Sequence, residues 1–130
     1  MAADIQQDID LGIARLEYGD PDRPQKAVLT ISTRKHYNRG LISTATVFWL
    51  GNPCRSTVIC LAGSGGDYSQ HLKYDHTLRA TQGNINAQHA TVFTPETIAR
   101  LTQAAKDHYA ANVRAGVDGF RNTYPLAVSA

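Results

Sequence analysis

The sequence predicts an α+β fold: an antiparallel β-meander of about five strands with one long C-terminal helix packed across or beside the sheet. Two observations predict it. Strand-like runs with short breaks fill the middle of the chain, and a capped helical segment with one apolar stripe follows them. A length of 130 residues fits a single domain over 1–130, with a mobile N-terminal arm at 1–8 and a C-terminal tail at 117–130.

The middle of the chain contains three strand-like runs. Val28–Thr33 alternates apolar and small polar residues, which is typical of a half-buried strand. Leu41–Leu50 is rich in β-branched and aromatic residues and follows a turn at Asn38 and Gly40, two residues that tolerate positive φ. Ser56–Ala62 is the third run. Short breaks between consecutive runs predict antiparallel pairing.

The flanking segments are weaker. Leu11–Tyr18 alternates enough for a first strand, and residues 19–24 form a turn rich in proline and aspartate. Residues 67–76 suit an edge strand, because only one of their faces is apolar. Residues 79–89 fit either a short capped helix or a loop, since a glycine and two asparagines disfavour a stable helix there.

The clearest boundary is the start of the C-terminal helix. Thr94 is a good N-cap, Pro95 suits the first helical position, and the dipole favours a carboxylate at Glu96. The helix is expected to run to about Ala115, where Gly116 ends it. Its apolar stripe has helical spacing and consists of Ile98, Leu101, Ala105, Tyr109 and Val113.

Charge is unevenly distributed, although the net charge is only +2. Residues 1–22 contain six acids and one base, whereas residues 23–66 contain six bases and no acid. One interpretation is that the basic block pairs with the acidic segment of its own or a neighbouring chain. The other is that the block contacts phosphates or an acidic protein.

A candidate nucleic-acid site follows from the second interpretation. Its cations stand at strand ends and turns, its hydroxyl groups share the outward face of the expected sheet, and its rings suit stacking on unpaired bases. The cations are Arg34, Lys35, Arg39 and Arg55, the hydroxyl residues are Thr30, Ser32, Thr44 and Thr46, and the rings are His36 and Tyr37. The alternative is an ordinary sheet face, because threonine suits strands in any case.

No motif indicates a catalytic residue, a cofactor or a metal site. The glycine-rich residues 63–66 lack the lysine and following helix of a phosphate loop, and the nucleophile-elbow pattern around Ser64 lacks its helix. His71 and His76 have the wrong spacing for a shared metal. The enzymatic alternative that remains is a small hydrolase using Ser64 or Cys60.

The order of elements resembles that of single-stranded RNA phage coat proteins. The similar parts are 27–53, the strand-like 90–93, the helix from Pro95, the tail ending at 124–126, and Cys54 after an Asn-Pro pair. The resemblance implies a capsid protein that dimerises with interlocked helices and binds an RNA hairpin on the opposite face of the sheet. It also implies an intersubunit disulfide at Cys54 in some shells, and an interface formed by Leu101, Ala105, Tyr109 and Val113.

The sequence therefore predicts a non-enzymatic, self-associating, RNA-binding coat-like protein of a phage. The alternative is a small phage- or plasmid-encoded inhibitor or adaptor, similar to anti-CRISPR proteins, that binds a larger protein or nucleoprotein complex. The acidic N-terminus is not a secretory signal and no apolar run reaches 18 residues. The expected location is therefore the virion or the host cytoplasm, with no membrane partner.

Overall fold

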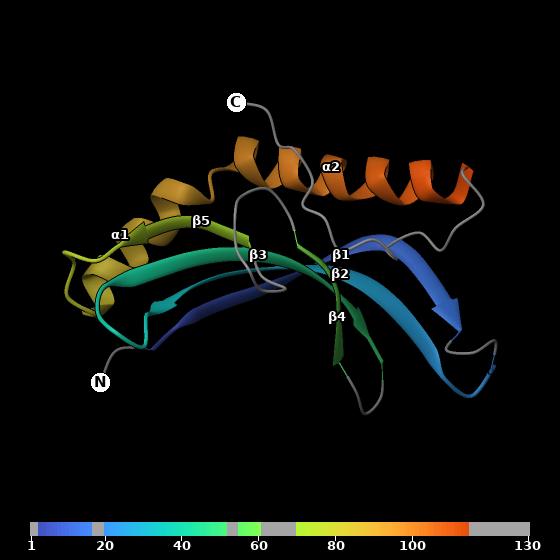
Figure 1. The fold of residues 1–130 in the computed structure, drawn as a ribbon, viewed down its shortest axis with the longest axis horizontal. Helices are drawn as coiled ribbons and strands as arrows, with labels where there is room; N and C mark the ends of the chain where they lie inside the picture. Colours follow the sequence, from blue (N-terminus) through green and yellow to red (C-terminus); the bar gives the residue numbers. More distant parts are fainter. Residues whose placement is uncertain (1–2, 17–19, 52–54, 61–69, 115–130) are drawn as a thin grey trace.

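The computed structural model describes residues 3–16, 20–51, 55–60 and 70–114. These residues form an α+β fold in which a curved antiparallel sheet carries two helices (Figure 1). The elements are β1 (Ile5–Leu16), β2 (Pro24–Lys35), β3 (Leu41–Leu50), β4 (Arg55–Cys60), β5 (Gln70–Asp75), α1 (Gln82–Val92) and α2 (Pro95–Arg114).

The strands β1 to β4 lie side by side in chain order, as the predicted meander requires. The fifth strand departs from the prediction, because β5 returns to pair with β3. The second edge of β3 is thus divided. Residues 46–50 pair with β4, and residues 41–45 pair with β5. This arrangement brings the end of β5 to the hairpin that joins β2 and β3, because Leu41 is opposite Asp75.

The first strand begins earlier than predicted. Residues 5–8, expected in an N-terminal arm, belong to β1 and pair with β2, with Ile5 opposite Thr33. The register shifts between Asp10 and Ala14, where Gly12 has a φ of 73°. Its N–H donates to Asp10 Oδ1 at 2.8 Å. β1 is therefore a long edge strand with a bulge, a device that interrupts a regular edge.

Two helices follow the sheet, so the prediction of a single long helix is wrong. Helix α2 starts at Pro95 as predicted, and the Thr94 hydroxyl accepts from the N–H of Thr97 at 3.2 Å. Helix α1 lies where the sequence fits either a short helix or a loop, and Thr81 is its N-cap. It also contains Ala90 to Val92, so the prediction of a strand-like segment at 90–93 is wrong. The N-cap at Thr81 offsets the weak helix propensity of the glycine and asparagines after it.

The core lies between the sheet and the helices. Leu29, Ile31 and Val47 from the strands meet Leu101 and Ala105 from α2, and all five are fully buried. Residues of odd number in β2 and β3 face the helices, so the even-numbered ones face the other way. The half-buried prediction for β2 is wrong, because Val28, Thr30 and Ser32 on the other face are buried as well.

Candidate nucleic-acid interface

The four hydroxyl residues of the predicted site do share one face. Thr30 is opposite Thr46, and Ser32 is opposite Thr44. All four are at most 8% exposed, so the expectation that they face outward is wrong. The hydroxyls of Ser32 and Thr44 lie 2.9 Å apart, and the Thr30 hydroxyl donates to Asp8 Oδ1 at 2.6 Å. They stabilise the sheet and are not presented to a ligand.

The side chains of Asp8 and Arg34, from neighbouring positions of the sheet, contact hydroxyl groups of this face. Arg34, one of the predicted cations, lies against the sheet with Nη1 3.5 Å from the hydroxyl of Thr44. Asp8 approaches from β1, because it is opposite Thr30 in the register. A period of two correctly assigns residues to one face of a strand, but neighbouring side chains decide whether that face is exposed.

The end of the β2–β3 hairpin is the exposed part of the predicted site. The His36 N–H donates to the Gly40 carbonyl at 3.0 Å, which closes a turn over residues 37–39. Tyr37 at this turn is 87% exposed, and its ring centroid lies 4.4 Å from that of His36. Lys35 and Arg39 flank the two rings and are also exposed. Within the described residues neither cation forms an ion pair.

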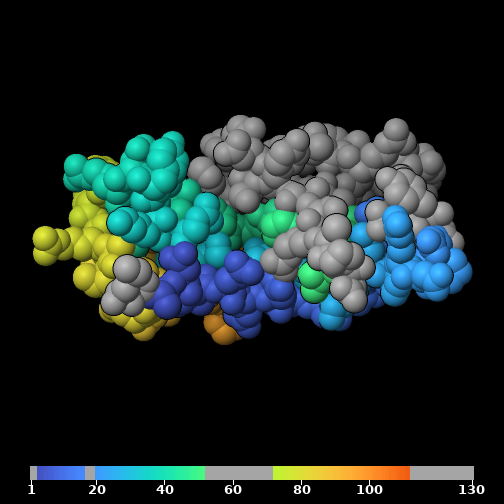
Figure 2. All heavy atoms as spheres, turned by 90° about the horizontal axis from the view of Figure 1, so that it is seen from below, coloured from blue at the N-terminus to red at the C-terminus, as the bar shows by residue number. Residues whose placement is uncertain are grey.

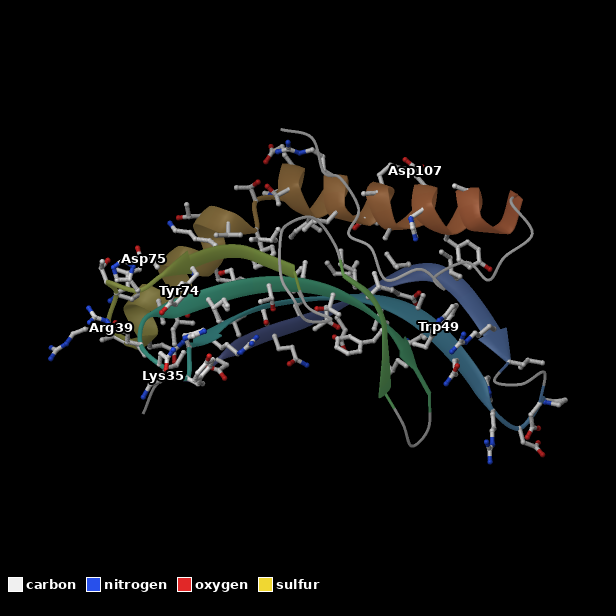
Figure 3. All side chains as sticks on the ribbon, in the orientation of Figure 1. Lys35, Arg39, Trp49, Tyr74, Asp75 and Asp107 are labelled. Carbon is white, nitrogen blue, oxygen red and sulfur yellow. The ribbon has the colours of Figure 1, made fainter. Side chains whose placement is uncertain are left out.

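Two further rings come from the end of β5. The ring of Tyr74 lies 4.5 Å from that of His36, and His76 follows at 6.4 Å from Tyr74. The Tyr74 hydroxyl donates to the Arg39 carbonyl at 2.7 Å. Figure 3 shows Tyr74 beside Arg39 and Lys35 at one end of the molecule. We name the set His36, Tyr37, Arg39, Tyr74 and His76, with Lys35, the hairpin-end cluster.

Tyr74 and His76 were not predicted as site residues. Their alternation along residues 67–76 indicated that they share a face of an edge strand. Only the pairing of β5 with β3 places that face beside the hairpin. The alternation of one strand does not indicate which strand it pairs with after a long connection. This alternation was therefore insufficient to predict Tyr74 and His76 as site residues.

A surface pocket of about 460 Å³ opens beside the hairpin-end cluster. It lies between the hairpin and residues 76–80, which connect β5 to α1. Three cations line it, Lys35, Arg39 and Arg79, and no acid is among the described residues of its lining. Seen from below in Figure 2, the hairpin (teal) and the segment around α1 (yellow) adjoin at this end of the molecule. The pocket is therefore a site of positive potential.

Asp75 is the acid nearest in sequence to this pocket. Its Oδ1 accepts hydrogen bonds from the hydroxyl of Thr77 and, at 2.9 Å, from the Thr77 N–H. These two hydrogen bonds, the side-chain one first, lower the pKa of Asp75 below its ordinary value. The carboxylate is thus ionised at neutral pH and holds the turn that follows β5.

Other predicted site residues lie elsewhere. Arg55 begins β4 opposite Leu50, at the far end of β3 from the Lys35–Leu41 pair. Ten residues of strand separate those ends by roughly 30 Å, so Arg55 does not join the hairpin-end cluster. Its side chain is outside the described residues, as are Cys54, the side chain of Cys60, and residues 61–69 with Ser64.

The predicted interface stripe belongs to the core of the chain itself. Leu101 and Ala105 are fully buried against the sheet, and Tyr109 packs against the same core. Within one chain these residues contact its own sheet, and their role as a surface for a second chain stays a prediction. The side chain of Val113 lies outside the described residues.

The acidic N-terminal segment pairs with part of the basic block. Asp20 Oδ2 lies 3.8 Å from Arg23 Nε, and Asp10 Oδ2 lies 3.7 Å from Lys26 Nζ. At the other end of β1, Asp4 accepts only a long hydrogen bond of 3.4 Å from the backbone N–H of Lys35. Pairing of the basic block with the acidic segment is thus confirmed for Arg23 and Lys26, and contact of the block with phosphates or an acidic protein stays a prediction.

The comparisons with known proteins identify no relative. No protein-family model, curated protein or solved structure shows significant similarity to the chain. In the part of the chain that is described, no three His, Cys, Asp or Glu residues are placed to hold a metal ion. None of the described helices is both long and apolar enough to cross a membrane.

Proposed function

We propose that this chain is a non-enzymatic, self-associating, coat-like protein that binds RNA at the hairpin-end cluster. The observation that carries the proposal is the gathering of exposed rings and of cations that form no ion pair among the described residues, at one end of the sheet. Cations neutralise phosphates, and rings stack on unpaired bases, so the combination suits a single-stranded or looped RNA.

We propose the RNA contact at the hairpin-end cluster and not on the sheet face that the coat-protein resemblance implied. The hydroxyl groups of that face are buried and hydrogen-bonded to one another and to Asp8. The hairpin-end cluster instead combines exposed cations with Tyr37 at 87% exposure. RNA recognition of this kind depends on stacking and charge more than on base-edge hydrogen bonds.

Self-association is proposed through the edge of the sheet. Among the described strands, β1 has β2 as its only neighbour, so it is the edge at which we propose that a second copy pairs. Pairing of such edges between two copies extends an antiparallel sheet across a dimer. The regular part of this edge, residues 5–10, lies before the bulge at Gly12.

Assembly is tested on the purified protein by size-exclusion chromatography with light scattering. Large particles that contain RNA are the expected result. A monomer or small dimer without nucleic acid would contradict the coat-like assignment and favour an inhibitor or adaptor that binds a larger complex.

RNA binding is tested by titration over a salt series. Replacing Lys35 and Arg39 with alanine is expected to lower the salt slope by about one unit each, because each neutralised phosphate releases a counterion. The matched control is Arg23→Ala with Lys26→Ala, which removes the same charge where Asp20 and Asp10 pair with it. If both double variants lose the same RNA affinity and salt slope, the effect depends on net charge alone, which would contradict a localised site.

A further inference from the structure

The pocket between the β2–β3 hairpin and residues 76–80 is lined by several cations. It combines residues far apart in sequence, Lys35 and Arg39 on one wall and Arg79 on the other. We infer that this pocket binds one internal phosphodiester group of a single-stranded RNA. The inference rests on the proposed RNA-binding function and assigns a specific contact within it.

Arg39 is held in a way that suits phosphate recognition. Its Nε donates to the His76 carbonyl at 3.0 Å, while its own carbonyl accepts from the Tyr74 hydroxyl at 2.7 Å. The bond from Nε anchors the guanidinium at the pocket wall. Both Nη groups have no hydrogen bond among the described residues, and a guanidinium can offer paired donors to two phosphate oxygens. Anchoring lowers the entropy lost on binding.

The opposite wall is anchored as well. The Arg79 carbonyl accepts from the Thr81 N–H at 2.8 Å and from Asn84 Nδ2 at 3.0 Å. These bonds fix the backbone of Arg79 at the start of α1, which leaves its exposed side chain at the pocket. The positive end of the α1 dipole adds to the same potential. The anchored guanidinium of Arg39, the side chain of Arg79 and Lys35 thus line a space of about 460 Å³.

The neighbouring rings favour a nucleotide strand over a free anion. Tyr37 and His36 form a tilted pair at 4.4 Å on the same hairpin that supplies Arg39. Asn38 and Arg39 of this hairpin line the pocket, so we expect a base adjacent to a bound phosphate to reach the exposed Tyr37 ring. Inorganic phosphate would use the cations but not the rings, so the two sources of phosphate are distinguishable.

The test measures the affinity of a 5′-hydroxyl oligouridine for the unaltered chain and for the Arg79→Gln variant. About a tenfold loss and a salt slope lower by about one unit are expected for the variant. Lys106→Gln is the matched control, because it removes one exposed charge from α2 and is expected to change neither quantity by more than twofold. Arg79→Lys keeps the charge but loses the paired donors, and is expected to recover the salt slope with only part of the affinity.

The outcomes separate this inference from the proposed function. If Arg79→Gln binds like the full chain while Lys35→Ala with Arg39→Ala does not, the pocket assignment fails and the RNA-binding proposal stands. If the unaltered chain does not bind the oligouridine, both fail. Inorganic phosphate in millimolar excess is expected to compete weakly. A clear preference for a 5′-phosphorylated oligouridine, or for inorganic phosphate, would overturn the internal phosphodiester assignment.

Discussion

Gly40 and Asp75 are in direct backbone contact where the β2–β3 hairpin meets the end of β5. A Cβ atom at Gly40 would lie 2.2 Å from the Asp75 carbonyl oxygen, and Gly40 has a φ of 88°. Only glycine satisfies both conditions, because other residues disfavour this φ and their Cβ atoms need more space. This contact places Arg39 beside His76, and therefore determines the geometry of both the hairpin-end cluster and the pocket.

We expect Gly40→Ala to lower the free energy of unfolding by about 2–4 kcal/mol, because φ strain and the clash with Asp75 act together. Gly12→Ala is the matched control. Its φ is 73°, but nothing lies within 4 Å of the added Cβ, so only the strain of about 1–2 kcal/mol applies. Urea denaturation measures both values. Equal losses in the two variants would show that the hairpin does not press against β5.

Tyr37 provides a test of base stacking that is independent of charge. Tyr37→Ala is expected to weaken oligouridine binding by about 1–3 kcal/mol, without change in the salt slope. The variant should fold normally, because the ring is 87% exposed. Tyr37→Phe keeps the aromatic face and is expected to bind as the unaltered chain does. A loss in the phenylalanine variant as large as in the alanine variant would assign the effect to the hydroxyl and exclude stacking.

Leu101 tests the contact between α2 and the sheet. Leu101→Asp places a carboxylate at a position with no solvent exposure, and we expect it to cost about 3–5 kcal/mol or to prevent folding. Ala99→Asp, at an exposed position of the same helix, is expected to stay within about 0.5 kcal/mol of the unaltered chain. Thermal melting measured by circular dichroism compares the two. A melting temperature of Leu101→Asp within a few degrees of the control would remove Leu101 from the core.

His89 predicts a dependence of stability on pH. Its Nδ1 lies 2.8 Å from the Thr33 hydroxyl and its ring 4.8 Å from that of Phe93, and burial lowers its pKa below 6.5. The unfolded chain therefore binds a proton more readily than the folded one. The stability contribution is complete above about pH 6.5 and is lost as the pH falls through the lower folded pKa.

The urea midpoint is accordingly expected to be flat above neutral pH and to fall below about pH 6.5. Burial lowers the pKa of His108 as well, so His89→Gln should remove part of the fall and the double variant with His108→Gln most of it. The lowered pKa of Asp75 acts in a separate window, below its ordinary value of 3.8. A fall of the same size in the double variant would exclude both histidines as its cause.

Local signals in the sequence were enough to predict several elements. Thr94 and Pro95 determine the start of α2, because a cap and a fixed φ act within one turn of the chain. Gly40 was expected at positive φ in the turn between β2 and β3, and it adopts that conformation. Thr30 and Thr46 were correctly placed on one face, because the period of a strand is a local property.

Only the tertiary structure decided which residues the faces of the strands contact. On the buried hydroxyl face, Asp8 contacts Thr30 and Arg34 contacts Thr44 from neighbouring positions of the sheet. Tyr74 and His76 join His36 because β5 pairs with β3 after a long connection. The sequence by itself determined the start of α2, the alternation of β2 and β3 and the uneven charge, since these depend on residues close together in the chain. The pairing of β5 and the pocket depend on contacts between distant residues, whose free energies are settled only when the whole sheet is assembled.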